Sequence, residues 1–110
     1  MDNVFFAQDM ETQILDEKTS RRILAHSPEL MLVEVIVETG GIGKMHTHPH
    51  VQATYVKSGR FRFTVEGNDR EVAAGDSLLF PANALHGMVC LESGMLLDVF
   101  TPEREDFLKK

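Results

Sequence analysis

Apolar residues recur at every second position in several short segments of this chain, and this period constrains the fold more than any other feature. In the segment 30–38, valine occupies positions 33, 35 and 37. In the segment 60–65, phenylalanine occupies positions 61 and 63 and valine occupies position 65. A period of two puts alternate side chains on opposite faces of a β-strand, whereas a helix repeats every 3.6 residues. β-Branched and aromatic residues also favour strands. Both segments are therefore predicted to be strands.

Glycine, proline and asparagine divide the rest of the chain into similar short segments. Gly67-Asn68 is a turn signal, so 60–65 and 70–74 are expected to form a hairpin. Residues 58–59 and 92–94 are expected to end strands. A short helix is expected after Pro102, with Lys109 and Lys110 at its end. Many short strands with regular turns predict an all-β sandwich or barrel. The other expected strands are 4–6, 21–26, 53–56, 77–80, 86–91 and 95–100.

The length of 110 residues fits one domain, residues 1–110. The single cysteine, Cys90, excludes an intramolecular disulfide and a cysteine-pair zinc site. No segment resembles a signal peptide or approaches the ~20 apolar residues of a membrane span, so we expect a cytoplasmic protein with no membrane partner. The net charge of -6 argues against nucleic acid as a partner, because nucleic-acid binding needs a basic surface.

Three of the five histidines lie within residues 46–50. Imidazole is the commonest metal ligand among side chains. On an extended strand His46 and His48 point to the same side, and Gln52 shares their parity. Neutral nitrogen and amide donors gathered on one strand face are not typical of core packing. They predict half of a metal site.

Two series of residues along the chain have a recognisable spacing. The first is Gly40, five residues, His46-x-His48, three residues, Gln52, six residues and Gly59. The second is Gly75, five residues, Pro81-x-Asn83, two residues, His86, three residues and Cys90. These spacings resemble the two motifs that bracket the metal in the cupin superfamily. The departures are Gln52, Asn83 and Cys90, where the motifs have Glu, Gly and Asn.

The resemblance implies a small single-domain cupin, which is a double-stranded β-helix or jelly-roll barrel, holding one divalent metal ion. By the same resemblance the metal ligands are His46, His48, Gln52 and His86. His50 has the ligand parity, but the proline before it is expected to bend the strand, so we place His50 beside the site or at its rim. His26 is expected at the surface or in a loop. The alternative is a barrel that has lost its metal and keeps the histidines as packing.

Glutamine at position 52 changes the charge of the expected site. Three histidines and a glutamate carry one negative charge, whereas three histidines and Gln52 carry none. The ion then keeps its full positive charge and acts as a stronger Lewis acid toward bound oxygens. Imidazole and oxygen donors fit Ni, Zn, Mn, Co or Fe, and the sequence does not choose among them. The neutral ligand favours polarising a hydroxyl or carbonyl of a sugar-like substrate over dioxygen chemistry.

The C-terminal segment carries a second group of candidate residues. Asp98 and Phe100 share a strand face, and Arg104 follows the turn at Pro102, close enough to fold back over the barrel mouth. A carboxylate in an apolar strand is costly unless it is paired or used. The structural alternative has Asp98 bonded to the backbone or to Arg104, Phe100 in the core and Arg104 on a solvated helix.

The histidine cluster and the C-terminal segment together resemble the KdgF-type cupins, the pectin-degradation proteins, from about residue 30 to the C-terminus. That family converts 4,5-unsaturated uronates, released by pectin or alginate lyases, into open-chain keto sugars. The resemblance implies a small anionic sugar as substrate and a homodimer as the assembly. It marks Asp98, Phe100 and Arg104 as functional residues. From the chemistry we hypothesise that Asp98 is the general acid/base and that Arg104 is the bidentate partner of the substrate carboxylate. We hypothesise in the same way that Phe100 forms a wall of the pocket.

Two other functions fit the same cupin motifs. A metal-dependent cupin dioxygenase acting on a small molecule would consume oxygen and require iron, and Gln52 argues against it. A non-enzymatic sugar-binding cupin would bind its ligand without turnover. Such modules usually come attached to a regulatory domain, and 110 residues leave no room for one.

Overall fold

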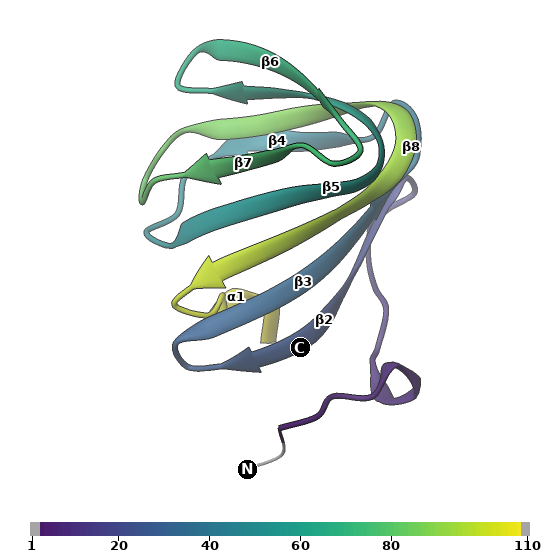
Figure 1. Cartoon of the computed structure of the whole chain (residues 1–110), viewed down its shortest axis with the longest axis vertical. Helices are drawn as coiled ribbons and strands as arrows, with labels where there is room; N and C mark the ends of the chain where they lie inside the picture. Colours follow the sequence, from purple (N-terminus) through teal and green to yellow (C-terminus); the bar gives the residue numbers. More distant parts are fainter. Residues whose placement is uncertain (1–2, 109–110) are drawn as a thin grey trace.

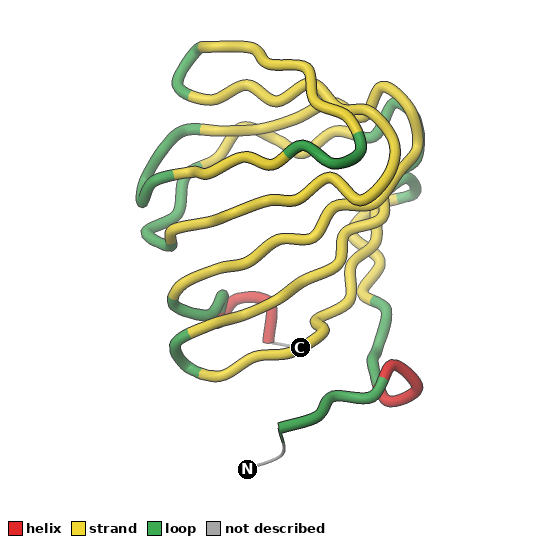
Figure 2. Tube along the Cα trace, viewed as in Figure 1, coloured by secondary structure: helices red, strands yellow, loops and turns green. Residues whose placement is uncertain are grey.

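The computed structural model describes residues 3–108, most of which lie in β-strands (Figure 2). A short 3-10 turn, Ala7–Asp9, precedes the strands, and a short helix, α1 (Glu105–Leu108), follows them. Within residues 3–108, no helix is long and apolar enough to cross a membrane. The strands are β1 (Gln13–Asp16), β2 (Thr19–Ser27), β3 (Leu30–Val37), β4 (Ile42–His46), β5 (Val51–Val65), β6 (Asn68–Ala73), β7 (Ser77–Phe80) and β8 (His86–Thr101).

The strands form an antiparallel sheet that folds over on itself (Figure 1). Their order is β1-β2-β3-β8-β5-β6, with β4 beside β8 and β7 beside β5. The long strands β5 and β8 pair with each other along their length. β8 pairs with β4 at its start and with β3 at its end, while β5 pairs with β7 first and then with β6. The predicted all-β cupin fold with a short C-terminal helix is confirmed.

The two long strands bend at a point where glycine is required. Gly59 has a φ of +84°, and a Cβ there would lie 2.6 Å from the carbonyl oxygen of Glu92. The register between β5 and β8 shifts repeatedly between Val56 and Phe61. Even-numbered residues of β5 are therefore buried before the bend, and Phe61 and Phe63 after it. The predicted strand ends at 58–59 and 92–94 were wrong, because these residues bend continuous strands instead of ending them.

Both ends of the chain also differ from the sequence prediction. Residues 4–6 are not a strand, and the first strand begins at Gln13. The side chains of residues 4–6 are exposed, so no buried face stabilises a strand there. The helix begins at Glu105, three residues after Pro102. The predicted helix end at Lys109 and Lys110 lies outside the described residues.

Two apolar clusters fill the interior of the barrel. The first contains Phe61, Phe63 and Phe80, all of which are buried. The second is smaller and is built around Phe100. Burial of each such side chain contributes ~1.5–3 kcal/mol to folding. The members are Val37, Val56, Phe61, Phe63, Phe80, Cys90 and Leu96 in the first cluster and Met31, Val33 and Phe100 in the second.

Candidate metal centre

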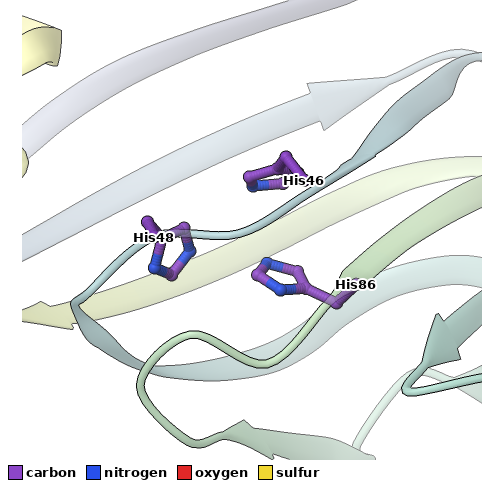
Figure 3. A group of neighbouring side chains, drawn as sticks. All are labelled: His46, His48 and His86. Carbon is purple, nitrogen blue, oxygen red and sulfur yellow. The ribbon is translucent and has the colours of Figure 1, made fainter.

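Two neighbouring histidines, His46 and His48, and the distant His86 converge inside the barrel (Figure 3). His46 ends β4, His48 lies in the loop that follows, and His86 begins β8. β4 and β8 pair with His46 directly opposite His86. The ring nitrogens that the three side chains offer lie within 4.8 Å of one another. Strand pairing therefore brings together the three histidines that the two sequence motifs indicate.

The backbone orients all three imidazole rings in the same manner. In each ring Nδ1 contacts a carbonyl oxygen two residues away, at 2.7 Å for His46, 3.1 Å for His48 and 2.9 Å for His86. A carbonyl only accepts, so Nδ1 carries the proton and Nε2 carries the lone pair in the neutral ring. Such contacts fix the tautomer and the direction of a ligating histidine.

The two apolar clusters hold the rings of the buried histidines. His86 stacks on Phe80 with a centroid distance of 4.5 Å, and His48 meets Phe100 edge-on at 5.8 Å. His48 and His86 are buried, while His46 is exposed. Burial is the main cause that lowers the pKa of both His48 and His86. The neutral imidazole, which is the form that binds metal, is therefore favoured.

The contact between His48 and Gln52 joins two acceptors. Oε1 of Gln52 lies 3.0 Å from Nε2 of His48, which carries the lone pair. The Gln52 amide is oriented by its own Nε2, which donates to Oγ1 of Thr54 at 2.9 Å. Two lone pairs that face each other at this distance are stabilised by a cation that both can bind. Imidazole and amide-oxygen donors suit a divalent transition metal, so the residues present fit such an ion.

A line of hydrogen bonds connects this donor set to Asp98. Thr54 accepts from Gln52 and donates through Oγ1 to Oδ1 of Asp98 at 2.6 Å. Thr54 and Asp98 are register partners on β5 and β8, so strand pairing sets this contact. Burial raises the pKa of Asp98 to about 6, against the opposing hydrogen bonds from Thr54 and Gln52. This carboxyl can therefore exist in both protonation states near neutral pH.

Arg104 lies beside Phe100, but it pairs with a different carboxylate from Asp98. Its Nε and Nη2 donate to the two carboxylate oxygens of Asp106 at 3.1 and 2.9 Å. These bonds lower the pKa of Asp106. The guanidinium carbon lies 5.2 Å from the centre of the Phe100 ring and 4.3 Å from that of Phe107. The alternative in which Asp98 is bonded to Arg104 is therefore wrong.

The candidate residues other than His48 line a common cavity of about 530 Å³. A larger cavity, about 750 Å³, lies beside the N-terminal segment and contains none of them. The smaller cavity is therefore the candidate site of the reaction. Its lining includes His46, Gln52, His86, Asp98, Phe100 and Arg104.

The two remaining histidines both contact Glu103, the residue before Arg104. Nε2 of His50 lies 3.1 Å from the Glu103 carbonyl oxygen, and Nδ1 of His26 lies 2.8 Å from its carboxylate. The Glu103 amide also donates to the carbonyl oxygen of Pro28 at 3.2 Å. His50 is thus outside the three-histidine group, as predicted, and it helps to anchor the segment that carries Arg104.

Sequence reasoning missed Thr54, which connects Gln52 to Asp98, and Arg21, which lines the cavity. Thr54 shares the parity of Gln52 on one strand, so the period-two argument that selected Gln52 applies to it as well. Arg21 is a charged residue at an inward position of β2 and lines the same cavity. Most residues of β2 are polar, so no signal in the sequence separated Arg21 from its neighbour Arg22.

Comparisons with known proteins agree with this fold and donor set. The cupin domain family matches residues 33–100. The chain is 37% identical over 110 residues to the pectin degradation protein KdgF of Dickeya dadantii, covering 98% of this chain and 100% of that protein. It therefore belongs to the cupin family and, within it, to the KdgF-type members.

Two solved structures show the same similarity in three dimensions. The structure of KdgF from a Halomonas species has a TM-score of 0.90 and 34% identity, over 97% of this chain and 99% of that one. An RmlC-like cupin from Shewanella frigidimarina has a TM-score of 0.91 and 36% identity, over 97% and 96%. The similarity in both cases extends over nearly the whole of each chain.

Proposed function

We propose that this protein converts 4,5-unsaturated uronates, the products of pectin or alginate lyases, into linear keto sugars in a metal-dependent isomerisation. One observation carries the proposal. Oε1 of Gln52 lies against Nε2 of His48, and hydrogen bonds continue from Gln52 through Thr54 to Asp98, so a carboxyl that can hold or release a proton is connected to the candidate metal ligands. The relative from Dickeya dadantii, which is named a pectin degradation protein, supports a uronate as the substrate.

The proposed reaction needs no oxidant or reductant. A proton leaves the hydroxyl on C1, the bond between C1 and the ring oxygen breaks, and C1 becomes an aldehyde. The ring oxygen becomes the oxygen of an enolate at C5, and a proton added to C4 converts this enolate into a ketone. One proton leaves oxygen and one joins carbon, so substrate and product are isomers.

Each of three residues of the cavity has a different role in this reaction. Asp98, whose pKa is raised to about 6, transfers a proton between the hydroxyl and carbon positions. Phe100 offers an apolar face against which the sugar is oriented. Arg104 offers a guanidinium to the substrate carboxylate, which would compete there with Asp106. The cationic groups in the cavity offset the net charge of -6 of the whole chain, which would repel an anionic sugar.

The metal ion would be held by His46, His48, Gln52 and His86. When bound, it supplies positive charge that stabilises negative charge developing on the substrate oxygens. The donor set fits Ni, Zn, Mn, Co or Fe. Because Gln52 is neutral, none of that charge is cancelled by a ligand carboxylate.

The experiment follows the ultraviolet absorbance of an unsaturated uronate, which arises from its double bond conjugated with the carboxylate. Ketonisation removes this absorbance, so the protein should accelerate its loss. A chelator should return the rate to that without protein, and an added divalent metal should restore it. A rate unaffected by the protein would refute the proposal, and oxygen uptake coupled to substrate loss would support a dioxygenase instead.

Asp98→Asn tests the role of the carboxyl within this proposal. The variant should lose ketonisation activity while it remains folded and binds metal, because asparagine cannot carry the proton. Full activity in a folded, metal-loaded variant would exclude the acid/base role. A panel of uronates from pectin and from alginate would then define the preferred substrate.

We further propose that the protein assembles as a homodimer and acts in the cytoplasm. Exposed apolar side chains on the N-terminal segment and β1, including Phe6 at 60% exposure and Ile14 at 74%, support an interface there. Light scattering in solution should give twice the mass of one chain, and the mass of a single chain would refute the dimer.

A further inference from the structure

Arg21 is a second arginine in the cavity that contains the candidate metal ligands. It lies on β2 opposite Val35 of β3, at the parity of Thr19 and Ile23. Its side chain lines the cavity together with His46 and Arg104. A charged side chain on an inward face is costly unless it is paired or used.

The surroundings of Arg21 hold its guanidinium in place and leave its end available. Nε donates to Oε1 of Gln13 at 2.7 Å, and Nε2 of Gln13 donates to the carbonyl oxygen of Phe107 at 3.1 Å. The guanidinium carbon lies 3.6 Å from the centre of the Phe107 ring. Among the residues from 3 to 108, neither Nη atom of Arg21 has a hydrogen-bond partner or a carboxylate at ion-pair distance.

Arg104 packs on the same aromatic ring as Arg21. Its guanidinium carbon lies 4.3 Å from the centre of the Phe107 ring, so α1 is held between two arginines that are distant in sequence. Burial, followed by the charge of Arg104, lowers the pKa of Arg21. The negative charge of Asp106 acts on both arginines and opposes this shift, so it offsets part of their mutual repulsion. An anion that enters the cavity meets a guanidinium on Arg104 that already binds Asp106, and a guanidinium on Arg21 whose Nη groups have no partner among residues 3–108.

We propose that the two Nη groups of Arg21 bind the carboxylate of the uronate substrate in a bidentate, end-on arrangement, with Arg104 beside them. This inference rests on the proposed function and names a further determinant of its specificity. A planar guanidinium matches a planar carboxylate through two parallel N–H···O bonds. Arg21 then distinguishes a uronate from a neutral sugar of the same shape.

The test compares Arg21→Gln with Arg22→Gln in the full-length, metal-loaded protein. Arg22 is the matched control because it is the next residue on β2, faces the other way and pairs with Glu34 at 3.0 Å. In Arg21→Gln the KM for the unsaturated uronate should rise about 10- to 100-fold, as expected for lost charge-assisted hydrogen bonds. Its kcat should change by less than about threefold, because the lost contact is made equally in the ground state. Arg22→Gln should match the wild type in both.

Arg21→Lys provides a second variant that keeps the charge and loses the planar fork. Its KM should lie between those of the wild type and Arg21→Gln, which keeps the test decisive if the glutamine variant does not fold. A KM in Arg21→Lys equal to that of the wild type would overturn the bidentate arrangement. A KM in Arg21→Gln equal to that of Arg22→Gln would overturn the proposal as a whole.

Calorimetry with saturated sugars separates this inference from the proposed function. Galacturonate should bind the wild type more tightly than galactose, and Arg21→Gln should remove that preference. Equal affinity of the wild type for both sugars, or equal weakening of both in the variant, would mean that Arg21 only supports the packing of α1. If the wild type converts no unsaturated uronate but still selects galacturonate through Arg21, the proposed function fails and the carboxylate site stands.

Discussion

Replacing Asp98 with asparagine should stabilise the metal-free protein, although the same change should abolish its activity. Burial raises the pKa of Asp98 from 3.8 to about 6, so the folded protein binds a proton there more tightly than the unfolded chain. The ionised carboxylate therefore opposes folding. Asparagine has no charge to bury, and its Oδ1 can still accept the hydrogen bond from Thr54.

The sign and size of this effect follow from the two pKa values. Below pH 3.8, the pKa in the unfolded chain, the carboxyl is neutral in both the folded and the unfolded state and does not change the free energy of folding. As the pH rises toward 6 the unfolded chain ionises more readily, so the folded state loses relative stability. Above pH 6 the buried carboxylate destabilises the folded state by its full amount, about 3 kcal/mol. Roughly half of this destabilisation is already present at pH 5. Asp98→Asn should therefore gain more stability at pH 8 than at pH 5, by about 1 to 2 kcal/mol.

The assay is urea unfolding of the wild type and the variant at both pH values, with a chelator present throughout. Asp69→Asn is the matched control because Thr64 donates to Asp69 at 2.6 Å, the same distance as from Thr54 to Asp98, at an exposed position. The control reports how the loss of a charge beside the same threonine contact changes the free energy of unfolding when the carboxylate is not buried. A free-energy difference between Asp98→Asn and wild type that is the same at both pH values, or larger at pH 5, would refute the reasoning.

Two further substitutions test the bend and the donor set. Gly59→Ala should lower the free energy of unfolding by at least ~2 kcal/mol, because it adds a clash with Glu92 to a positive φ. Gly67→Ala, with a similar φ and nothing within 4 Å, should cost less, and equal urea midpoints would contradict the clash. Gln52→Glu should make the metal harder to remove with a chelator and should lower kcat, because a negative ligand offsets the charge of the ion. Unchanged chelator resistance, measured by residual metal content, would count against Gln52 as a ligand.

The alternation of apolar and polar residues was sufficient to predict the all-β fold, but it could not show how the strands continue. The turn signals at 58–59 and 92–94 are real local preferences, yet each lies inside a strand. What keeps these strands continuous is the pairing of β5 with β8, a contact between segments about 35 residues apart that no local pattern encodes. Gly59 was therefore correctly identified as special and wrongly interpreted as a strand end.

The same distinction applies to the site. His46, His48 and Gln52 share a parity within one stretch of chain, and His86 has a motif of its own, so spacing was enough to select the group that the structure brings together. Arg21 has no such spacing relative to the others. Its place in the cavity depends on where α1 packs, through a contact with a ring 86 positions further along the chain. Sequence periodicity carries no information about a contact of that kind.

Gln52 connects the candidate metal ligands to the proposed acid/base in a way that a glutamate could not. Its oxygen faces His48 while its nitrogen donates to Thr54, and this leaves the Thr54 hydroxyl proton for Asp98. A carboxylate at position 52 has no proton to donate, so the hydroxyl of Thr54 would face two acceptors and could satisfy only one. It would also put a second negative charge one hydroxyl group away from the buried Asp98, which repulsion would drive further toward its neutral form. The neutral ligand and the titratable aspartate therefore depend on each other: the amide allows a single carboxyl to gain and lose its proton beside the metal ligands.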